Sequence, residues 1–175
     1  GLSQLGMRES QNRKIAATFE QILQSGEHLL NVVNDVLDLS KLEAGKLTVE
    51  ARPFELRKTV GLCVDMLRPR AREKALQIRA EFSEDIPERV QGDSFRVQQI
   101  LINILGNAIK FTEHGSVLLD VRYQSGFYCF KVRDTGIGMS SEQLQRLFMP
   151  FHQFENSLTK NHEGTGLGLS ISNTL

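Results

Sequence analysis

Four short segments follow one another in a fixed order near the end of the chain, and this order constrains the fold more than any other feature. The segments are Asn103 to Lys110 (NILGNAIK), Asp134 to Gly138 (DTGIG), Phe148 to Phe151 (FMPF) and Gly164 to Leu169 (GTGLGL). Any one alone is weak, because two glycines one residue apart occur in many turns. An amide-rich helix, a carboxylate beside glycines, an aromatic stretch and a second glycine turn rarely coincide, so together they predict an ATP pocket.

Composition narrows the class of protein. The 175 residues, 40% of them hydrophobic, suffice for one domain or for a small domain with a helical attachment. The 21 basic residues equal the 21 acidic ones, so no net field favours nucleic acid or a membrane surface, and phosphate must be bound by local groups. Cys63 and Cys129 lack CxxC or zinc-ligand spacing, which predicts buried thiols in a reducing compartment. No run approaches the roughly 20 apolar residues of a membrane span, so we expect a soluble fragment.

The first part of the chain has helical periodicity. Apolar or small residues recur in steps of four and three at Ile15, Phe19, Ile22, Gly26, Leu29, Val33 and Val36. This pattern predicts an amphipathic helix that ends near Ala44 and Gly45 and packs lengthwise in a bundle. Residues 1–9 resemble the end of a preceding helix, so we expect the chain to begin within an element.

A second domain is predicted after Gly45. The alternation over residues 47–52 predicts a strand that Pro53 ends. Further on, the patterns predict helices over 56–74 and 94–111, strands over 76–82, 116–123 and 127–133, a turn around Pro87 and a hairpin turn at 124–126. This order is typical of an α+β fold with helices on one face of a mixed sheet.

Polar side chains share one side of the helix predicted over 94–111. On a helix turning roughly 100° per residue, they fall within about 80° of one another: Arg96, Gln99, Asn103, Asn107 and Lys110. Amide oxygens suit a Mg²⁺ ion that keeps several waters, and Lys110 can neutralise a phosphate one turn later. A solvated amphipathic face would explain the same stripe, but the glycine motifs that follow favour a binding site.

Asp134 continues the apolar row of a strand. Tyr128, Phe130 and Val132 alternate on one face, and Asp134 keeps their parity where the chain meets Gly136. A carboxylate above an apolar floor needs a donor, which the exocyclic amine of adenine would supply. Gly136 and Gly138 would let the backbone approach a purine or phosphate. The alternative is that Asp134 serves only as a turn or capping residue.

The second glycine turn precedes another predicted helix. Its residues, whose backbone N–H groups would receive phosphates, are Gly164, Thr165, Gly166, Leu167 and Gly168. The turn fits neither the P-loop nor the Rossmann pattern. Phe148, Phe151 and Phe154 are predicted to be core or hinge residues, and the polar run 155–163 is predicted to be a mobile lid or an ordinary surface loop.

With these segments, Gln24 to Gly45 resembles the second dimerisation helix of sensor histidine kinases, especially the hybrid type. The other segments resemble the N, G1, F and G2 boxes of that family, in the order given above. The resemblance implies a partial helical dimerisation hairpin over residues 1–45, which lacks the phosphoacceptor segment. It also implies an ATP-binding catalytic domain of the Bergerat or GHKL fold, an α/β sandwich, over residues 46–175, incomplete at its C-terminus.

The resemblance also implies roles for the site residues. Asn107 would hold Mg²⁺, while Asn103 and Lys110 would assist at the metal and the phosphates. Asp134 would bind adenine, the two glycine turns would border ATP, and the lid would close over the triphosphate. The phosphorylated histidine of the family lies in a segment similar to Ser-His-Glu-Leu-Arg-Thr-Pro, a context that is absent around His28, His114, His152 and His162.

The implied protein is an ATP-dependent histidine kinase that passes phosphate from a histidine outside this chain to a receiver aspartate. It would form a homodimer through the helical bundle and belong to the cytoplasmic portion of a membrane-anchored bacterial sensor. Neither nucleic acid nor direct membrane contact is expected. Related gyrase-type and chaperone-type ATPases place a glutamate four residues before the metal-binding asparagine, where this chain has Asn103. We therefore predict phosphoryl transfer to protein in preference to ATP hydrolysis.

Two other functions remain open at this point. The chain could be a regulatory module that dimerises through its helical stripe with partner kinases and never turns over ATP. It could also be a serine kinase of the mitochondrial dehydrogenase-kinase type, although the helix ending in Asp-Leu-Ser-Lys-Leu-Glu-Ala-Gly45 disfavours this.

Overall fold

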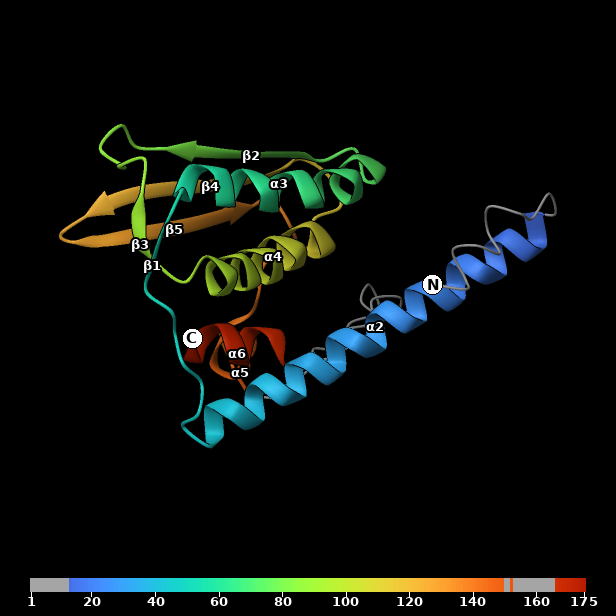
Figure 1. Cartoon of the computed structure of the whole chain (residues 1–175). Helices are drawn as coiled ribbons and strands as arrows, with labels where there is room; N and C mark the ends of the chain where they lie inside the picture. Colours follow the sequence, from blue (N-terminus) through green and yellow to red (C-terminus); the bar gives the residue numbers. More distant parts are fainter. Residues whose placement is uncertain (1–12, 150–151, 153–165) are drawn as a thin grey trace. The chain divides into compact units, whose positions relative to one another are not determined.

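The computed structural model describes residues 13–149, 152 and 166–175 (Figure 1). The internal contacts divide the chain into two units, residues 1–47 and 48–175. The described part of the first unit is dominated by one helix, α2 (Arg13–Glu43). It ends as predicted, with hydrogen bonds from Gly45 N to Leu42 O (3.0 Å) and from Lys46 N to Lys41 O (2.9 Å). These two bonds form a Schellman motif, which closes the helix at Gly45.

The apolar residues of α2 are exposed. Leu29 and Leu30 expose 63% and 64% of their surface, and the same face includes Ile15, Ile22, Val33, Val36 and Leu37. A stripe of this length is too apolar for a helix that remains fully in water.

The second unit is built on a mixed three-stranded sheet in the order β2 (Gln77–Phe82), β4 (Ser116–Gln124), β5 (Phe127–Asp134). β2 and β4 are parallel, whereas β4 and β5 are antiparallel. The helices α3 (Leu56–Glu73) and α4 (Ser94–Phe111) lie on one face of this sheet (Figure 1). This arrangement confirms the predicted α+β class, and both helices begin at the predicted residues.

The hairpin between β4 and β5 also forms where the sequence predicts it. Gln124 pairs with Phe127, and the two residues between them, Ser125 and Gly126, have φ angles of 51° and 87°. Two positive φ angles define a type I′ turn, whose twist matches that of the flanking strands. The turn fixes the register of β5 and hence the face to which Asp134 belongs.

The core lies between the sheet and the two helices. Its fully buried members include Leu56, Val60 and Cys63 from α3, Leu105 from α4, and Val117, Leu119 and Val121 from β4. On α4 the buried residues are Leu101, Leu105, Ala108 and Ile109, which lie opposite the polar stripe. Burial of this apolar side therefore turns the polar stripe outward.

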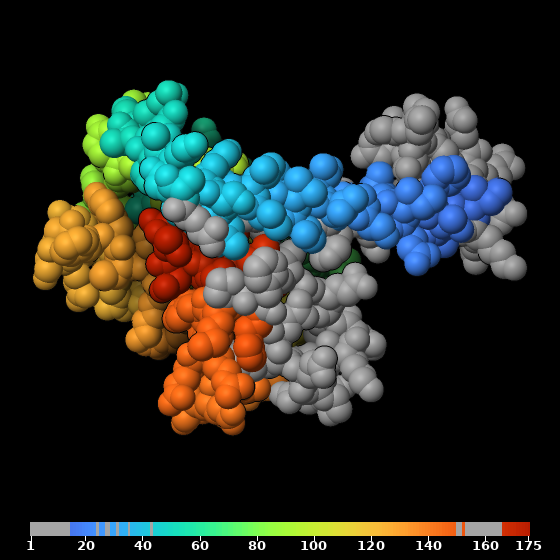
Figure 2. All heavy atoms as spheres, turned by 90° about the horizontal axis from the view of Figure 1, so that it is seen from below, coloured from blue at the N-terminus to red at the C-terminus, as the bar shows by residue number. Residues whose placement is uncertain are grey.

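Two short helices complete the described part of this unit. α5 (Ser141–Arg146) begins with a capping box between Ser140 and Gln143, and α6 (Gly168–Thr174) packs against α4. Figure 2 shows α5 in orange and α6 in red, bordering one another on the surface. The sequence signal for α5 was present, because Ser-x-x-Gln is a capping box, but the pattern analysis missed it.

The strand predicted over residues 47–52 is wrong. Residues 46–51 form neither helix nor strand, and the short β1 (Arg52–Phe54) contains Pro53, which was predicted to end the strand. Among the described strands, β1 pairs only with β3 (Val90–Gly92), which was not predicted. A proline is tolerated in β1 because this strand lies at the edge of a two-stranded sheet. Residues 47–51 alternate between apolar and polar side chains, but this pattern alone does not make a strand unless a neighbouring strand provides hydrogen bonds.

The prediction that both thiols are buried is wrong for Cys129. Cys63 is buried in the core, but Cys129 is exposed. Cys129 lies opposite Arg122 on β4, on the face of the sheet that α3 and α4 do not cover. Side chains alternate between the two faces of a strand, so the parity of β5 places Cys129 outside.

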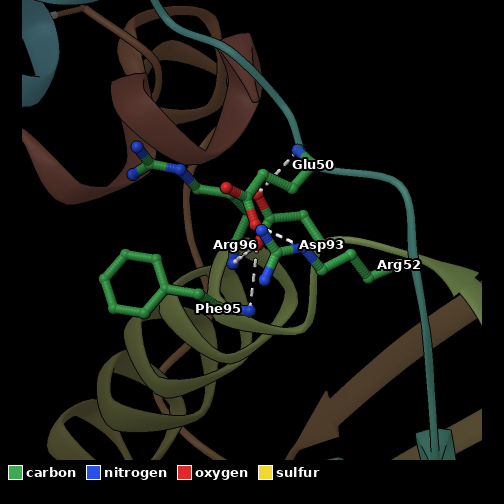
Figure 3. Close-up of polar contacts among 5 residues, drawn as sticks. All are labelled: Glu50, Arg52, Asp93, Phe95 and Arg96. Carbon is green, nitrogen blue, oxygen red and sulfur yellow. Dashed lines mark hydrogen bonds and ion pairs between the residues drawn. The ribbon is translucent and has the colours of Figure 1, made fainter.

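Asp93 connects the start of α4 to the segment that precedes β1 (Figure 3). Its Oδ1 accepts hydrogen bonds from the amides of Phe95 and Arg96, both at 3.1 Å, and its Oδ2 accepts from the amide of Glu50 at 3.2 Å. Desolvation raises the pKa of Asp93, but the amides of Arg96, Glu50 and Phe95 outweigh it and hold the pKa below its ordinary value. The carboxylate is both the N-cap of α4 and a tertiary contact.

Candidate nucleotide-binding site

The polar stripe of α4 is half buried and internally bonded. Asn107 Nδ2 donates to Asn103 Oδ1 at 3.3 Å, and Asn103 Nδ2 donates to Ser172 Oγ on α6 at 2.9 Å. Nearer the N-terminus of the helix, Arg96 Nη1 donates to Gln99 Oε1 at 2.6 Å. The two asparagines, one turn apart, therefore form a short chain of amides that ends at α6.

Gly168 lies directly against this amide chain. A Cβ at Gly168 would collide with Oδ1 of Asn103, so any other residue would push α6 away from α4. Ser172, the partner of Asn103, is itself bonded to Gly168 O at 2.8 Å. Gly168, the last residue of the second glycine turn, is thus brought to the asparagines through a close backbone approach, and α6 begins at this residue, one position earlier than predicted.

The turn after β5 lies against the other end of α4. Ile137 N donates to Phe111 O at 3.3 Å, and a Cβ at Gly136 would collide with the same carbonyl oxygen. Asp134, the last residue of β5, pairs with Val117 in the register of the sheet. The structure therefore brings the carboxylate and glycines of this turn to the C-terminal end of the helix that carries Asn107 and Lys110.

Asp134 also has the local role that the sequence left open. Its Oδ1 accepts a hydrogen bond from Gly136 N at 2.9 Å, which orients the carboxylate within the turn. The side chain as a whole is exposed. The turn role and a ligand role are compatible, because a carboxylate has two oxygens and several lone pairs.

Thr135 is a positioning residue that the sequence analysis missed. Its hydroxyl donates to His114 O at 2.9 Å and accepts from Ser116 N at 3.1 Å. These bonds join the Asp134 turn to the connection between α4 and β4. No short-range signal indicates them, because His114 and Thr135 are far apart in the sequence and meet only when β4 and β5 pair.

Lys110 is half buried in the last turn of α4, with its ammonium 5.1 Å from the centre of the Phe111 ring. Desolvation by burial lowers the pKa of Lys110 below its ordinary value of 10.5. A partly desolvated cation gains more from an adjacent anion than an exposed one, because solvent screens the interaction less.

Some of the predicted site residues lie outside the described residues: Gly164, Thr165, Phe151, Phe154 and the predicted lid 155–163. Gly138 and Gly166 adopt positive φ angles of 68° and 69° in their turns, and Leu167 is buried. Phe148, which follows α5, exposes 48% of its surface, so it is not a core residue of the described part.

The residues present fit a magnesium-bound phosphate. Oδ1 of Asn107 accepts no hydrogen bond from a described residue, whereas both ends of the neighbouring Asn103 amide are used. A neutral oxygen ligand next to a lysine is a donor set suited to Mg²⁺ and phosphate together, because Mg²⁺ retains water and shares phosphate oxygens. Asn103 holds the amide of Asn107 in place.

An α+β sandwich in which Gly168 lies against the amides on the side of α4, and the Asp134 turn lies at its C-terminal end, is the architecture of an ATP-binding domain of the GHKL type. The family model described as "Histidine kinase-, DNA gyrase B-, and HSP90-like ATPase" matches residues 92–175. The matched part of the chain, residues 92–175, therefore belongs to this family, and the proteins that the chain resembles are named as sensor histidine kinases.

Two curated relatives and one solved structure illustrate the similarity. The signal transduction histidine-protein kinase BarA of Escherichia coli (strain K12) is 44% identical over 159 residues, which cover 88% of this chain and 17% of BarA. The sensory/regulatory protein RpfC of Xanthomonas campestris pv. campestris is 41% identical over 160 residues, covering 88% of this chain and 22% of RpfC. Full-length ShkA in complex with AMPPNP has a TM-score of 0.79 and 32% identity, covering 99% of this chain and 36% of ShkA.

These comparisons confirm the family and fold that the sequence predicted, and they do not favour the regulatory-module alternative. The chain spans about a fifth of the length of the two curated relatives. Among the described residues, the helices are too short or too polar to cross a membrane.

Proposed function

We propose that this chain binds Mg-ATP and transfers its γ-phosphate to a histidine on a dimerisation helix outside the chain, for relay to a receiver aspartate. One observation supports this more than any other. The amide chain of Asn103 and Asn107 and the turn that begins at Asp134 are both fixed to α4, one along its side and one at its C-terminal carbonyl. A nucleotide with a base at one end and phosphates at the other requires such a pair of anchors.

The proposed roles follow from the chemistry of each group. Asp134 accepts a hydrogen bond from the exocyclic amine of adenine, and Gly136 and Gly138 leave room for the ring. Asn107 supplies an amide oxygen to Mg²⁺, Asn103 orients Asn107 and lies near enough to share in binding the metal, and Lys110 neutralises phosphate charge. The backbone of residues 164–168 borders the phosphates. Bound Mg²⁺ would supply charge neutralisation at the transferred group.

The same residues disfavour hydrolysis of ATP. General-base activation of water needs a carboxylate or imidazole within reach of the attacking proton, and Asn103 can provide neither. The chain's contribution is therefore to position ATP and stabilise charge. A purified chain that releases free phosphate rapidly from ATP would contradict this assignment.

Unit 1 has a separate proposed role. Residues 1–45 form part of a dimerisation hairpin, the apolar stripe of α2 pairs two copies in a homodimer, and residues 46–175 form the ATP-binding domain. The exposure of Leu29 and Leu30 supports this, since apolar residues at such spacing are stable only when another helix covers them. In the full-length protein, the assembly would lie on the cytoplasmic side of a membrane-anchored bacterial sensor and engage a receiver domain.

Nucleotide titration tests the binding site. We expect Mg-dependent ATP binding by the wild-type chain, and Asn107→Ala or Asp134→Ala to weaken it by more than about tenfold, because each removes a polar contact to the ligand. Matched controls are Asn34→Ala on α2 and Asp85→Ala before β3, both exposed, which we expect to leave binding unchanged. Equal binding by all four variants would refute the proposed site.

A phosphorylation assay tests the reaction. Incubation with labelled Mg-ATP and the kinase's own histidine-bearing helix should yield a phosphoprotein that is lost in acid, as phosphohistidine is. An acid-stable product would instead indicate a serine kinase.

A further inference from the structure

The C-terminal end of α4 leaves carbonyl groups that need partners from outside the helix. The last four carbonyl oxygens of any α-helix accept no hydrogen bond within it, and α4 lacks a glycine at its end to close a Schellman motif. Its C-cap, Thr112, has an extended backbone (φ −103°, ψ 125°). The Thr112 hydroxyl donates to Ala108 O at 2.7 Å, and Ile137 N donates to Phe111 O. Two of the four carbonyls, those of Ile109 and Lys110, remain to be satisfied.

Lys74 satisfies both. Its ammonium Nζ donates to Lys110 O at 2.7 Å, to Ile109 O at 3.0 Å and to Thr112 O at 3.3 Å. An ammonium has three N–H donors, so all three are used on the backbone of one helix end. Its positive charge also lies at the negative end of the helix dipole, where a cation is stabilising.

The backbone of Lys74 is held just as firmly. It is the C-cap of α3, and the chain closes there in a Schellman motif, with Leu76 N bonded to Ala71 O at 2.8 Å and Ala75 N bonded to Arg72 O at 2.9 Å. Lys74 is part buried in its contacts to α4. Lys74 therefore fixes the C-terminal end of α4 against the C-terminal end of α3.

We propose that Lys74 is a positioning residue for the nucleotide site, because it holds the last turn of α4 in the geometry from which Asn107 and Lys110 reach the metal and phosphates. The inference rests on the proposed function and adds a residue that lies outside the binding constellation. The carbonyls that Lys74 binds belong to Lys110 itself and to its neighbour. The adjacent carbonyl of Phe111 holds the turn that begins at Asp134, so the same terminus sets the spacing between the two halves of the site.

Lys74→Met tests this, because methionine keeps the length of the side chain and removes its three donors. The readouts are the dissociation constants of ATP with and without Mg²⁺, and hydrogen exchange of residues 106–112 in the nucleotide-free chain. We expect the affinity for Mg-ATP to fall by about tenfold or more, the range for groups that orient a metal ligand. Affinity without Mg²⁺ should change less, and exchange at the end of α4 should accelerate.

Lys58→Met is the matched control. It makes the same substitution at an exposed lysine of α3, the helix that Lys74 caps. Its binding and exchange should equal those of the wild type. If Lys74→Met binds Mg-ATP like the wild type, or loses affinity equally with and without Mg²⁺, the proposal is overturned.

Two further variants keep the test decisive if Lys74→Met fails to fold. Lys74→Arg and Lys74→Gln retain donors, and the proposal requires Mg-ATP affinity to fall in the order wild type, Arg, Gln. Equal affinities in the folded variants would overturn it. Absence of Mg-ATP binding by the wild-type chain would instead overturn the proposed function, and this inference with it.

Discussion

α2 and α4 are amphipathic helices with similar periodicity and opposite fates. On α2, 31 residues long, Leu30 exposes 64% of its surface, whereas on α4, 18 residues long, Leu105 is completely buried. The apolar side of α4 packs on α3 and the sheet, and both of its ends are held by tertiary contacts, Asp93 at one and Lys74 at the other.

The difference teaches that periodicity identifies an apolar face but not its partner. Within unit 2 the partner of such a face is the chain itself. For α2 we propose a second copy of the chain. The predictions below test this contrast, from the largest expected effect to the smallest.

The largest effect is expected in the core. Leu105→Ala should lower the free energy of unfolding of unit 2 by about 2–5 kcal/mol, because it leaves a cavity among buried side chains. Urea denaturation followed by tyrosine fluorescence measures this unit alone, since the chain has 2 tyrosines, Tyr123 and Tyr128, and no tryptophan.

Leu30→Ala is the matched control, and we expect it to affect self-association rather than the stability of unit 2. It should change the stability of unit 2 by less than about 0.5 kcal/mol, as exposed substitutions do. It should instead weaken self-association by about tenfold, measured by sedimentation, if α2 pairs with a second copy. A Leu30→Ala chain that associates like the wild type would break the contrast.

The N-terminal anchor of α4 comes next. Asp93→Ala should destabilise unit 2 by about 1–2 kcal/mol, because it removes the N-cap acceptor and the contact to Glu50 N. The folded pKa is lowered from 3.8, so the ionised carboxylate contributes its stability above that value and loses it as the pH falls through the lowered pKa.

The difference in free energy of unfolding between wild type and Asp93→Ala, measured by urea denaturation from pH 7 to pH 2, should therefore shrink towards zero at the acid end. Asp65→Ala, which removes only an exposed ion pair with Arg68, is the control and should have little effect. A constant difference across the pH range would argue against the charge of Asp93 as the cause.

A smaller, stabilising effect is expected at Ala75. This residue has a φ of 53°, a backbone conformation that is unfavourable for a residue with a Cβ. Ala75→Gly should raise the free energy of unfolding by roughly 0.5–1 kcal/mol, offset in part by the greater freedom of glycine in the unfolded chain. Ala71→Gly, in the helical part of α3, should lower it, and thermal melting of both variants would show the opposite signs.

The smallest effect concerns the two thiols. Burial raises the pKa of Cys63 from 9.0 to about 11, so the folded state retains the proton, and this contribution to stability is lost as the pH rises from 9.0 towards 11. At pH 8 a thiol reagent should modify Cys129 at once and Cys63 only after unfolding. Cys129→Ser should abolish the fast phase, and rapid modification of Cys63 in the folded chain would contradict its burial.

Much of the fold could be predicted because local patterns and tertiary structure agree. α4 begins and ends at the predicted residues, and the hairpin turn forms at Ser125 and Gly126. Apart from α5, whose capping box was overlooked, the predictions failed where no local signal decides the outcome. β1 and β3 are short and depend on each other, and Cys129 is exposed because β5 has one uncovered face.

The candidate site divides in the same way. Asn103, Asn107, Lys110 and Asp134 could be proposed from their motifs, whereas Thr135 and Lys74 could not. Both bind backbone carbonyl groups that are far away in the sequence. Every residue has such a carbonyl, so the sequence does not indicate which one a side chain will bind.

The amino-acid sequence by itself determined the long helices and the strands of the main sheet, the apolar face of each helix and which side chains have the chemistry to bind a nucleotide, because these properties depend on residues a few positions apart. Only the tertiary structure decided that the Asp134 turn is joined to Phe111 O, that Gly168 lies against Asn103, and that Lys74 completes the end of α4. These contacts depend on how β4 pairs with β5 and how α3 packs on α4, and such pairings are set by the burial of the whole core.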